Sequence, residues 1–235
     1  MEFVVEPAIF ERFPGLRLAV VVAHGVDNRA DRPAAAARWR DAWDAAGREG
    51  AQYGNAQSHP RVRRWRERFR AQGISGKEFP SSAEALLRRA LKGGEPFAIN
   101  PLVDFYNSVS LRHAVPAGGF DLDHVAGPLE LRLTRPGDHF TALDEDAPLP
   151  VPPGEVAYAD GQTVLTRHFV WRQARTALIT PATRSVFLVS EILGEVGPDV
   201  ADAVLADLRD GLATLFDITP TYAAVLDADN PSAAT

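Results

Sequence analysis

The sequence contains no cysteine among its 235 residues. Disulfide bonds, thiolate nucleophiles and thiolate metal ligands are therefore excluded from its stability and its chemistry. No run of apolar residues approaches the roughly 18 that would cross a membrane. The segment 1–7 has no basic stretch followed by a long apolar run, so we expect no secretory signal and a cytoplasmic location.

Several local motifs of enzyme chemistry are also missing. The sequence has no Gly-x-Gly-x-x-Gly or Walker-type phosphate loop, no Gly-x-Ser-x-Gly nucleophile motif and no His-Glu-x-x-His zinc motif. Because these motifs are local in sequence, their absence argues against a nucleotide cofactor, a serine-elbow hydrolase and a zinc enzyme of that type. We therefore expect a protein without a cofactor.

The composition is that of an ordinary globular protein, with 46% hydrophobic and 24% charged residues. A chain of this length can bury a sizeable core in one large domain with a helical extension. The net charge of −6 argues against a nucleic acid partner, but the charge is unevenly distributed. Segment 61–92 contains ten cations and three glutamates, so it carries +7 and the rest of the chain carries −13.

Periodicity predicts an alternation of helices and strands. The apolar, β-branched run 16–23 predicts a buried strand. Helical spacing predicts helices over 33–48, 59–70, 100–113 and 198–216, and another that begins near Ser81 or Ser82 with Glu84 in a capping box. Further strands are expected over 129–133, 139–143 and 185–191, with a hairpin over 155–171 that turns at Asp160-Gly161.

The basic helix over 59–70 has two interpretations. A solvated, charged face is the commonest fate of such a run. Within the run, however, only Glu67 is available for pairing at helical spacing, and the unpaired charge favours contact with RNA. The residues predicted to make that contact are Arg63, Arg64, Arg66 and Arg70.

Acidic and histidine side chains gather after residue 120. Asp121, Asp123 and His124 lie within four residues, and Asp138-His139 follow in a later turn. Such side chains are able to bind a divalent ion. Aspartate is also common wherever a chain reverses, so we expect turn chemistry here and no metal.

Segment 100–121 resembles a known family. Asn-Pro-Leu-Val-Asp-Phe-Tyr-Asn-Ser-Val-Ser-Leu, followed by Val-Pro-Ala-Gly-Gly-Phe-Asp, is similar to the B3/B4 editing domain of the phenylalanyl-tRNA synthetase β-subunit. The residues that carry the pattern are Asp104, Asn107, Pro116, Phe120 and Asp121. The likeness extends over about 97–193, and the whole chain resembles the free-standing B3/B4 proteins.

This resemblance implies an α+β fold in which mixed and antiparallel sheets are flanked by helices, with a helical N-terminal extension. We expect segment 1–95 to be a strand and a basic helical region that pack on the core. Segment 96–220 would be the B3/B4-like core domain. The remaining 221–235 would be a C-terminal tail, frayed from residue 227 onward.

The resemblance also implies a pocket for the aminoacylated 3′ end of tRNA. In the synthetase this pocket hydrolyses tyrosine wrongly attached to the phenylalanine tRNA. By position, Glu191 matches the glutamate that recognises the tyrosine phenol, while Asn107 and Pro116 match wall residues. Two positions depart from the pattern: Gly118 stands where the synthetase pocket has a histidine, and Trp-Arg-Gln-Ala-Arg over 171–175 replaces a glycine-rich turn.

Hydrolysis of an aminoacyl ester needs a positioned water, a stabilised oxyanion and an anchored terminal adenosine, but no cofactor. Backbone N–H groups of Gly118 and Gly119 are candidates for the oxyanion contact. Glu191 would orient water or bind the ammonium group, and Asn107 would hold the ribose or the carbonyl. The residues expected to bind substrate or tRNA, through phosphate contacts and stacking on adenine, are Tyr106, Pro116, Arg167, Trp171, Arg172 and Arg175.

Each of these assignments has a structural alternative. The Gly118-Gly119 pair would serve equally as a turn, and Trp171 as a core residue of an alternating strand. Arg172 and Glu191 would also be explained by a partly buried ion pair between them.

Two functions therefore compete. The leading hypothesis is an aminoacyl-tRNA deacylase that clears a mischarged tRNA in trans. The alternative is a module that binds tRNA or an amino-acid-like ligand without turnover, which the two departures favour. Either way the expected partner is the aminoacylated 3′ end of tRNA, with no membrane and no nucleotide cofactor.

Overall fold

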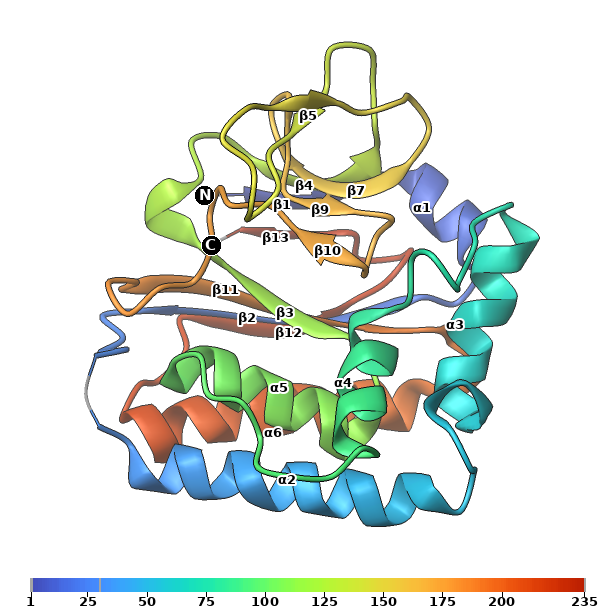
Figure 1. The fold of residues 1–235 in the computed structure, drawn as a ribbon. Helices are drawn as coiled ribbons and strands as arrows, with labels where there is room; N and C mark the ends of the chain where they lie inside the picture. Colours follow the sequence, from blue (N-terminus) through green and yellow to red (C-terminus); the bar gives the residue numbers. More distant parts are fainter. Residues whose placement is uncertain (1, 30, 235) are drawn as a thin grey trace.

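Two β-sheets stacked above a layer of helices make up the computed structural model, which describes residues 2–29 and 31–234 (Figure 1). The central, antiparallel sheet has four strands in the order β12 (Tyr222–Leu226), β2 (Arg17–His24), β11 (Ser185–Ile192) and β3 (Ala117–Asp121). β2 and β11 pair over their full lengths, Ser185 with His24 and Ile192 with Arg17. The expected strands over 16–23 and 185–191 are confirmed.

The second sheet is built from seven shorter strands. Their order is β13 (Ser232–Ala234), β1 (Glu2–Val5), β4 (Leu129–Leu133), β7 (Val156–Asp160), β8 (Thr163–Val164), β5 (His139–Phe140) and β6 (Leu149–Pro150). The β1–β4 and β5–β8 pairs are parallel and the others are antiparallel, so the sheet is mixed. A two-stranded ribbon of β9 (Thr166–Arg167) and β10 (Arg172–Gln173) lies between the sheets in Figure 1.

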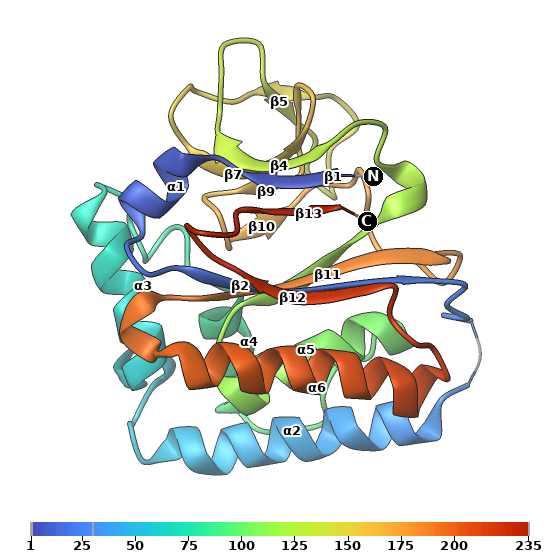
Figure 2. The same ribbon diagram turned by 180° about the vertical axis from the view of Figure 1, so that it is seen from behind.

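Six α-helices complete the described chain. They are α1 (Pro7–Arg12), α2 (Pro33–Ala51), α3 (Pro60–Ala71), α4 (Ser82–Ala90), α5 (Pro101–His113) and α6 (Pro198–Phe216). Short 3-10 turns occupy Ala56–Ser58, Leu122–His124 and Gly194–Val196. Figures 1 and 2 show α5 and α6 against the four-stranded sheet and α2 beneath them. The α+β fold class is therefore confirmed, and no described helix is long and apolar enough to cross a bilayer.

Local chemistry explains where the helices begin. The Asn100 side chain accepts a hydrogen bond from the N–H of Val103, and proline follows at the first position of α5. The Ser81 side chain accepts from the N–H of Glu84, so the expected cap of α4 is confirmed. α5 is buried on most of its surface because α2, α4, α6 and β3 all pack against it.

Side chains alternate across the four-stranded sheet. Along β11, Phe187 and Val189 face the seven-stranded sheet, while Val186 and Leu188 face the helices. The two faces therefore contribute to separate apolar clusters, one between the sheets and one against α5 and α6. Glu191 has the same parity as Phe187, which directs its side chain into the space between the sheets.

Three local expectations are wrong. Gly118 and Gly119 lie within β3 and do not form a turn. The hairpin turn at Asp160-Gly161 is present, but the returning strand is split into β8 and β9 and ends at Arg167, where His168 and Phe169 adopt left-handed backbone conformations. The C-terminal tail is not frayed where it is described.

In that tail, Ala233 pairs with Phe3 of β1 and is buried, because its strand completes the edge of the seven-stranded sheet. Thr235 lies outside the described residues. Strands from both ends of the chain thus complete the two sheets, and the segment boundaries at 95 and 220 stay predictions.

Candidate functional site between the sheets

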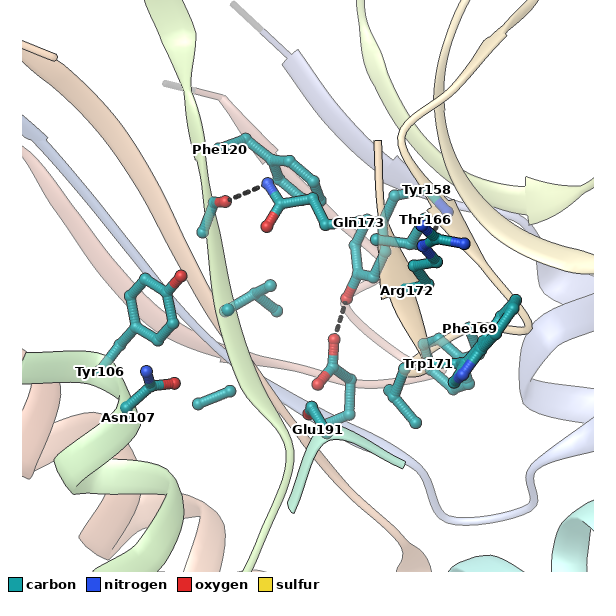
Figure 3. Close-up of a pocket in the computed structure, with 16 residues that line it drawn as sticks. Tyr106, Asn107, Phe120, Tyr158, Thr166, Phe169, Trp171, Arg172, Gln173 and Glu191 are labelled. Atoms are coloured by element: carbon teal, nitrogen blue, oxygen red, sulfur yellow. Dashed lines mark hydrogen bonds between the residues drawn. The ribbon is translucent and has the colours of Figure 1, made fainter. Parts of the chain in front are cut away.

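A cavity of about 160 Å³ lies between the two sheets, beside the β9–β10 ribbon (Figure 3). A protein cavity of about 150 Å³ is large enough to hold benzene, so this space fits roughly one aromatic ring. Its lining gathers seven of the predicted site residues, namely Tyr106, Asn107, Gly118, Gly119, Trp171, Arg172 and Glu191. These positions come from α5, β3, β10 and β11 and the loop before β10, so the fold brings together segments that are far apart in the chain.

Glu191 provides the carboxylic acid of the cavity lining. Its carboxyl Oε1 accepts a 2.7 Å hydrogen bond from the Tyr158 hydroxyl, and the residue is 4% exposed. Burial raises the pKa of Glu191 to about 7, although the bond from Tyr158 acts to lower it. At neutral pH the carboxyl is therefore present in both its protonated and its ionised form, as a general acid or base requires.

Tyr106 and Asn107 form the polar wall contributed by α5. Both residues are only 8% exposed and both line the cavity. Figure 3 shows both on one side of the β3 ribbon, with Tyr158 and Glu191 on the other. Burial, followed by the charge of Asp104, raises the pKa of the Tyr106 phenol, so this group is a neutral donor. A wall with polar groups that reach the cavity is suited to recognising a polar ligand.

The two glycines of β3 have opposite surroundings. A Cβ on Gly118 would meet no atom within 4 Å, because this position faces the open cavity. A Cβ on Gly119 would come within 2.7 Å of the Leu188 side chain, on the helix side of the sheet. Because Gly118 has no side chain, the cavity stays open at this position. Because Gly119 has none, β3 packs closely against Leu188.

The backbone of β3 also has a free side, since β3 is an edge strand. The Gly119 carbonyl accepts a 2.9 Å bond from the Gln173 side chain, and the Asp121 N–H donates to the Ala177 carbonyl. Alternate residues of an edge strand direct both backbone groups away from the sheet. The Gly119 N–H therefore points to this open edge, beside the cavity.

Arg172 and Trp171 form the rim. Arg172 pairs with Asp144, in the loop between β5 and β6, so the expected alternative of an Arg172–Glu191 ion pair is wrong. Glu191 lies deeper, where the Tyr158 phenol is within reach and the guanidinium is not. Trp171 is half-buried, with its ring centroid 4.7 Å from that of Phe79, so it is neither a core residue nor a free one.

Three predicted binding residues lie outside the lining. The Pro116 carbonyl accepts from the Ser190 hydroxyl at 2.6 Å and from the Glu191 N–H at 3.3 Å, so it supports the site from behind. Arg167 makes two bonds to Glu155, at 2.7 and 2.8 Å. Arg175 pairs with Asp146 at 2.7 Å beside the rim. Contacts of these three with a ligand stay predictions.

The basic helix is more neutralised than its own sequence indicates. Arg66 makes bonds of 2.9 and 3.1 Å to Glu84, which belongs to α4 and is fully buried. Both Arg63 and Arg64 share Glu67, at 3.5 and 3.3 Å. Arg70 is exposed near the end of the helix. The expectation that acidic partners are scarce is therefore wrong for Arg66, whereas contact between this surface and RNA stays a prediction.

The acidic cluster after residue 120 is used internally. Asp121 is 1% exposed and accepts a 2.6 Å bond from the Thr183 hydroxyl and a 3.1 Å bond from the Asp123 N–H. Asp138 pairs with the buried Arg132 at 2.6 Å. In the described part of the chain, no three histidine or acidic side chains are arranged to hold a metal ion.

Sequence reasoning missed several lining residues. They include Tyr158, Phe169, Gln173 and Val189, whereas Phe120 is part of the family pattern but is not among the predicted site residues. The direction of the Tyr158 side chain was predictable, because side chains alternate between the two faces along β7. Val156, two residues earlier, is buried in the same cluster between the sheets. The partner of that tyrosine could not be inferred, since Glu191 lies in the other sheet.

Comparisons with known proteins identify a family and a relative that this chain resembles. The model of the B3/4 domain family matches residues 65–197, which include every residue that lines the cavity. The phenylalanine–tRNA ligase β subunit of Idiomarina loihiensis is 25% identical over 142 residues, which are 60% of this chain and 17% of that protein. This chain therefore spans about a sixth of the length of that relative.

Among solved structures, an N-terminal fragment of the phenylalanyl-tRNA synthetase β-subunit from Pyrococcus horikoshii aligns with 96% of this chain and 53% of its own. The alignment has a TM-score of 0.48 and 11% sequence identity. The family match, by contrast, extends over more than half of the chain and contains the whole cavity. On that match, this chain belongs to the B3/4 domain family.

Proposed function

We propose that this protein binds the aminoacylated 3′ end of a tRNA in the cavity and hydrolyses the ester of a mischarged tRNA. The observation that carries the proposal is the convergence of Glu191, Asn107 and the Gly118 opening on one space of about 160 Å³. Membership of the B3/4 domain family, together with likeness to a phenylalanine–tRNA ligase β subunit, supports a tRNA as the partner.

The residues present are those that such a reaction needs. An ionised Glu191 would accept a proton from a water that attacks the ester carbonyl, and a pKa of about 7 suits this role at neutral pH. The Gly119 N–H, directed to the open edge of β3, would stabilise the oxyanion that forms. Asn107 would hold the ribose or the carbonyl from the opposite wall. No step requires a metal or an organic cofactor.

The rim would hold the nucleotide part of the substrate. Arg172 lines the cavity and Arg175 follows it by three residues, so both would contact the last phosphates. The half-buried ring of Trp171 is available for stacking on the terminal adenine. The exposed cations of α3, among them Arg63, Arg64 and Arg70, would contact the tRNA farther from its end.

Release of amino acid from a panel of mischarged tRNAs would test the proposal. Glu191→Gln keeps the shape of the side chain and an acceptor for Tyr158, but it cannot take up a proton. We expect it to slow release by at least about tenfold, since general base catalysis contributes roughly 10²- to 10⁴-fold. Glu11→Gln, an exposed position on α1, is the matched control. Absence of release from every tRNA in the panel would contradict the proposal.

A second candidate is a module that binds charged tRNA without turnover. It is favoured by two contacts, because Glu191 is already bonded to Tyr158 and Arg172 is already paired with Asp144. This candidate predicts saturable tRNA binding that weakens with salt and survives Glu191→Gln, with no release of amino acid.

A further inference from the structure

The hydrogen bond between Tyr158 and Glu191 connects the two sheets at the cavity. Tyr158 lies in β7 of the seven-stranded sheet, and Glu191 lies in β11 of the four-stranded sheet. The donor and acceptor oxygens are 2.7 Å apart, and both residues are almost fully buried. Figure 3 shows the bond within the cavity, opposite the wall formed by Tyr106 and Asn107.

The phenol is held rigidly. Its ring centroid lies 5.3 Å from that of Phe120, 6.1 Å from that of Phe3 and 6.2 Å from that of Phe169. The Tyr158 N–H donates to the Thr166 hydroxyl at 3.1 Å, which anchors the backbone as well. A donor fixed in this way determines the orientation of the flexible carboxyl group that it binds.

Only one of the two carboxyl oxygens is occupied by this bond. Oε1 accepts from Tyr158, whereas Oε2 has no side-chain partner in the described chain; the backbone N–H of Glu191 is the other group that hydrogen-bonds to this carboxyl, and it too lowers the pKa. Figure 3 shows Oε2 turned from Tyr158 toward the side of the cavity where Asn107 lies. The oxygen that would meet a water or a ligand is therefore selected by the phenol on the other sheet.

We propose that Tyr158 is a positioning residue for Glu191, holding one carboxyl oxygen and thereby turning the other toward the ligand. The inference rests on the proposed function, because it assigns the orientation of the group that would act on the ester. Tyr158 itself need not touch the substrate.

Few titratable or charged groups of the described chain lie near Glu191 to shift its pKa. The other titratable or charged groups of the lining are Tyr158 from β7, Tyr106 from α5 and Arg172 from β10, and of these Tyr158 hydrogen-bonds to Glu191. Its pairing partner on the adjacent strand β2 is the apolar Leu18. A hydrogen bond donated to a carboxylate stabilises the ionised form. Loss of the Tyr158 hydroxyl should therefore make Glu191 harder to ionise.

Tyr158→Phe tests this inference because it keeps the ring and removes only the hydroxyl. We expect kcat for ester hydrolysis to fall about tenfold or more with little change in KM. A catalytic group displaced by about 1 Å can lower the reaction rate about 100-fold. The pH midpoint of the rate should move upward. The matched control is Tyr222→Phe, whose position pairs with Val22 on β2 and lies away from Glu191.

A second measurement needs no tRNA. The midpoint at which Glu191 ionises, followed by carbon NMR of its carboxyl group, should move to higher pH in Tyr158→Phe and stay in place in Tyr222→Phe. In a Glu191→Gln background, Tyr158→Phe should change the rate much less than it does alone. An unchanged or lowered ionisation midpoint would overturn the inference, as would a fall in rate of equal size in both backgrounds. If the wild-type protein hydrolyses no ester, the proposed function fails, while the titration still decides whether Tyr158 governs Glu191.

Discussion

Arg172 reaches from the cavity rim to the Asp144 carboxylate, in the loop that joins β5 to β6. Three residues farther along β10 and its following loop, Arg175 bonds both to Asp146 and to the carbonyl of Glu145. The acidic side chains are highly exposed, at 73% for Asp144 and 101% for Asp146. A phosphate that approaches the rim must therefore compete with carboxylates of the same chain.

Removal of these carboxylates should strengthen tRNA binding. We expect Asp144→Asn combined with Asp146→Asn to raise the affinity for tRNA several-fold at about 0.1 M salt. At this ionic strength, screening limits electrostatic interactions to distances of about 10 Å. If both arginines become available, the slope of log affinity against log salt should steepen by about 1.4. Filter binding over a salt series measures both quantities. Asp227→Asn with Asp229→Asn removes the same charge from the β12–β13 turn, and an equal gain in that control would refute a specific role for the rim.

Alanine at the two glycines of β3 should have opposite effects. Gly119→Ala places a methyl group 2.7 Å from Leu188 and 2.8 Å from Ile179, which should lower the free energy of unfolding by about 1–3 kcal/mol. Gly118→Ala meets no neighbour, so stability should change by less than about 0.5 kcal/mol while the cavity narrows and ligand affinity falls. Urea unfolding together with tRNA binding separates the two effects. Equal destabilisation by both variants would show that Gly118 does not face open space.

We expect Arg66 to stabilise the folded protein and Arg70 to contribute little to its stability. Arg66→Ala would leave the buried Glu84 carboxylate with Arg88 as its remaining ion-pair partner. We expect a loss of about 2–4 kcal/mol, because an incompletely paired buried charge is costly. Arg70→Ala, on the exposed side of the same helix, should change the free energy of unfolding by less than about 0.5 kcal/mol. Chemical denaturation checks both values, and similar losses in the two variants would contradict this assignment.

Glu191 should make the folded protein less stable as the pH rises toward neutrality. Its pKa is about 7 in the folded protein against an ordinary value of 4.5, so the folded state retains a proton that the unfolded state releases between these values. The free energy of unfolding therefore falls as the pH increases through that window. Glu191→Gln removes this contribution.

Relative to wild type, the free energy of unfolding of Glu191→Gln should therefore increase by about 1–3 kcal/mol as the pH rises from about 5 to about 8. Each pKa unit corresponds to about 1.4 kcal/mol. Unfolding curves measured across this range provide the comparison, with Glu11→Gln as the exposed control. Parallel pH profiles for wild type and Glu191→Gln would show that the carboxyl is not perturbed.

The elements themselves follow from local patterns. The β-branched run that forms β2, the proline-led α5 and the capping of α4 by Ser81 depend on neighbours a few residues away, so periodicity and cap chemistry predict them. Seven of the predicted site residues also line the cavity, and three of them, Asn107, Gly118 and Glu191, are aligned by position in the resemblance of segment 97–193 to a known domain.

Long-range contacts decided the rest. Tyr158 meets Glu191 across two sheets, Arg66 finds Glu84 on another helix and Arg172 finds Asp144 in a distant loop. Likewise, β13 is ordered only because β1 offers it an unpaired edge. Composition and periodicity determine which faces are apolar and where elements begin. The pairing of buried polar groups depends on how sheets and helices are stacked, and this stacking exists only in the folded chain.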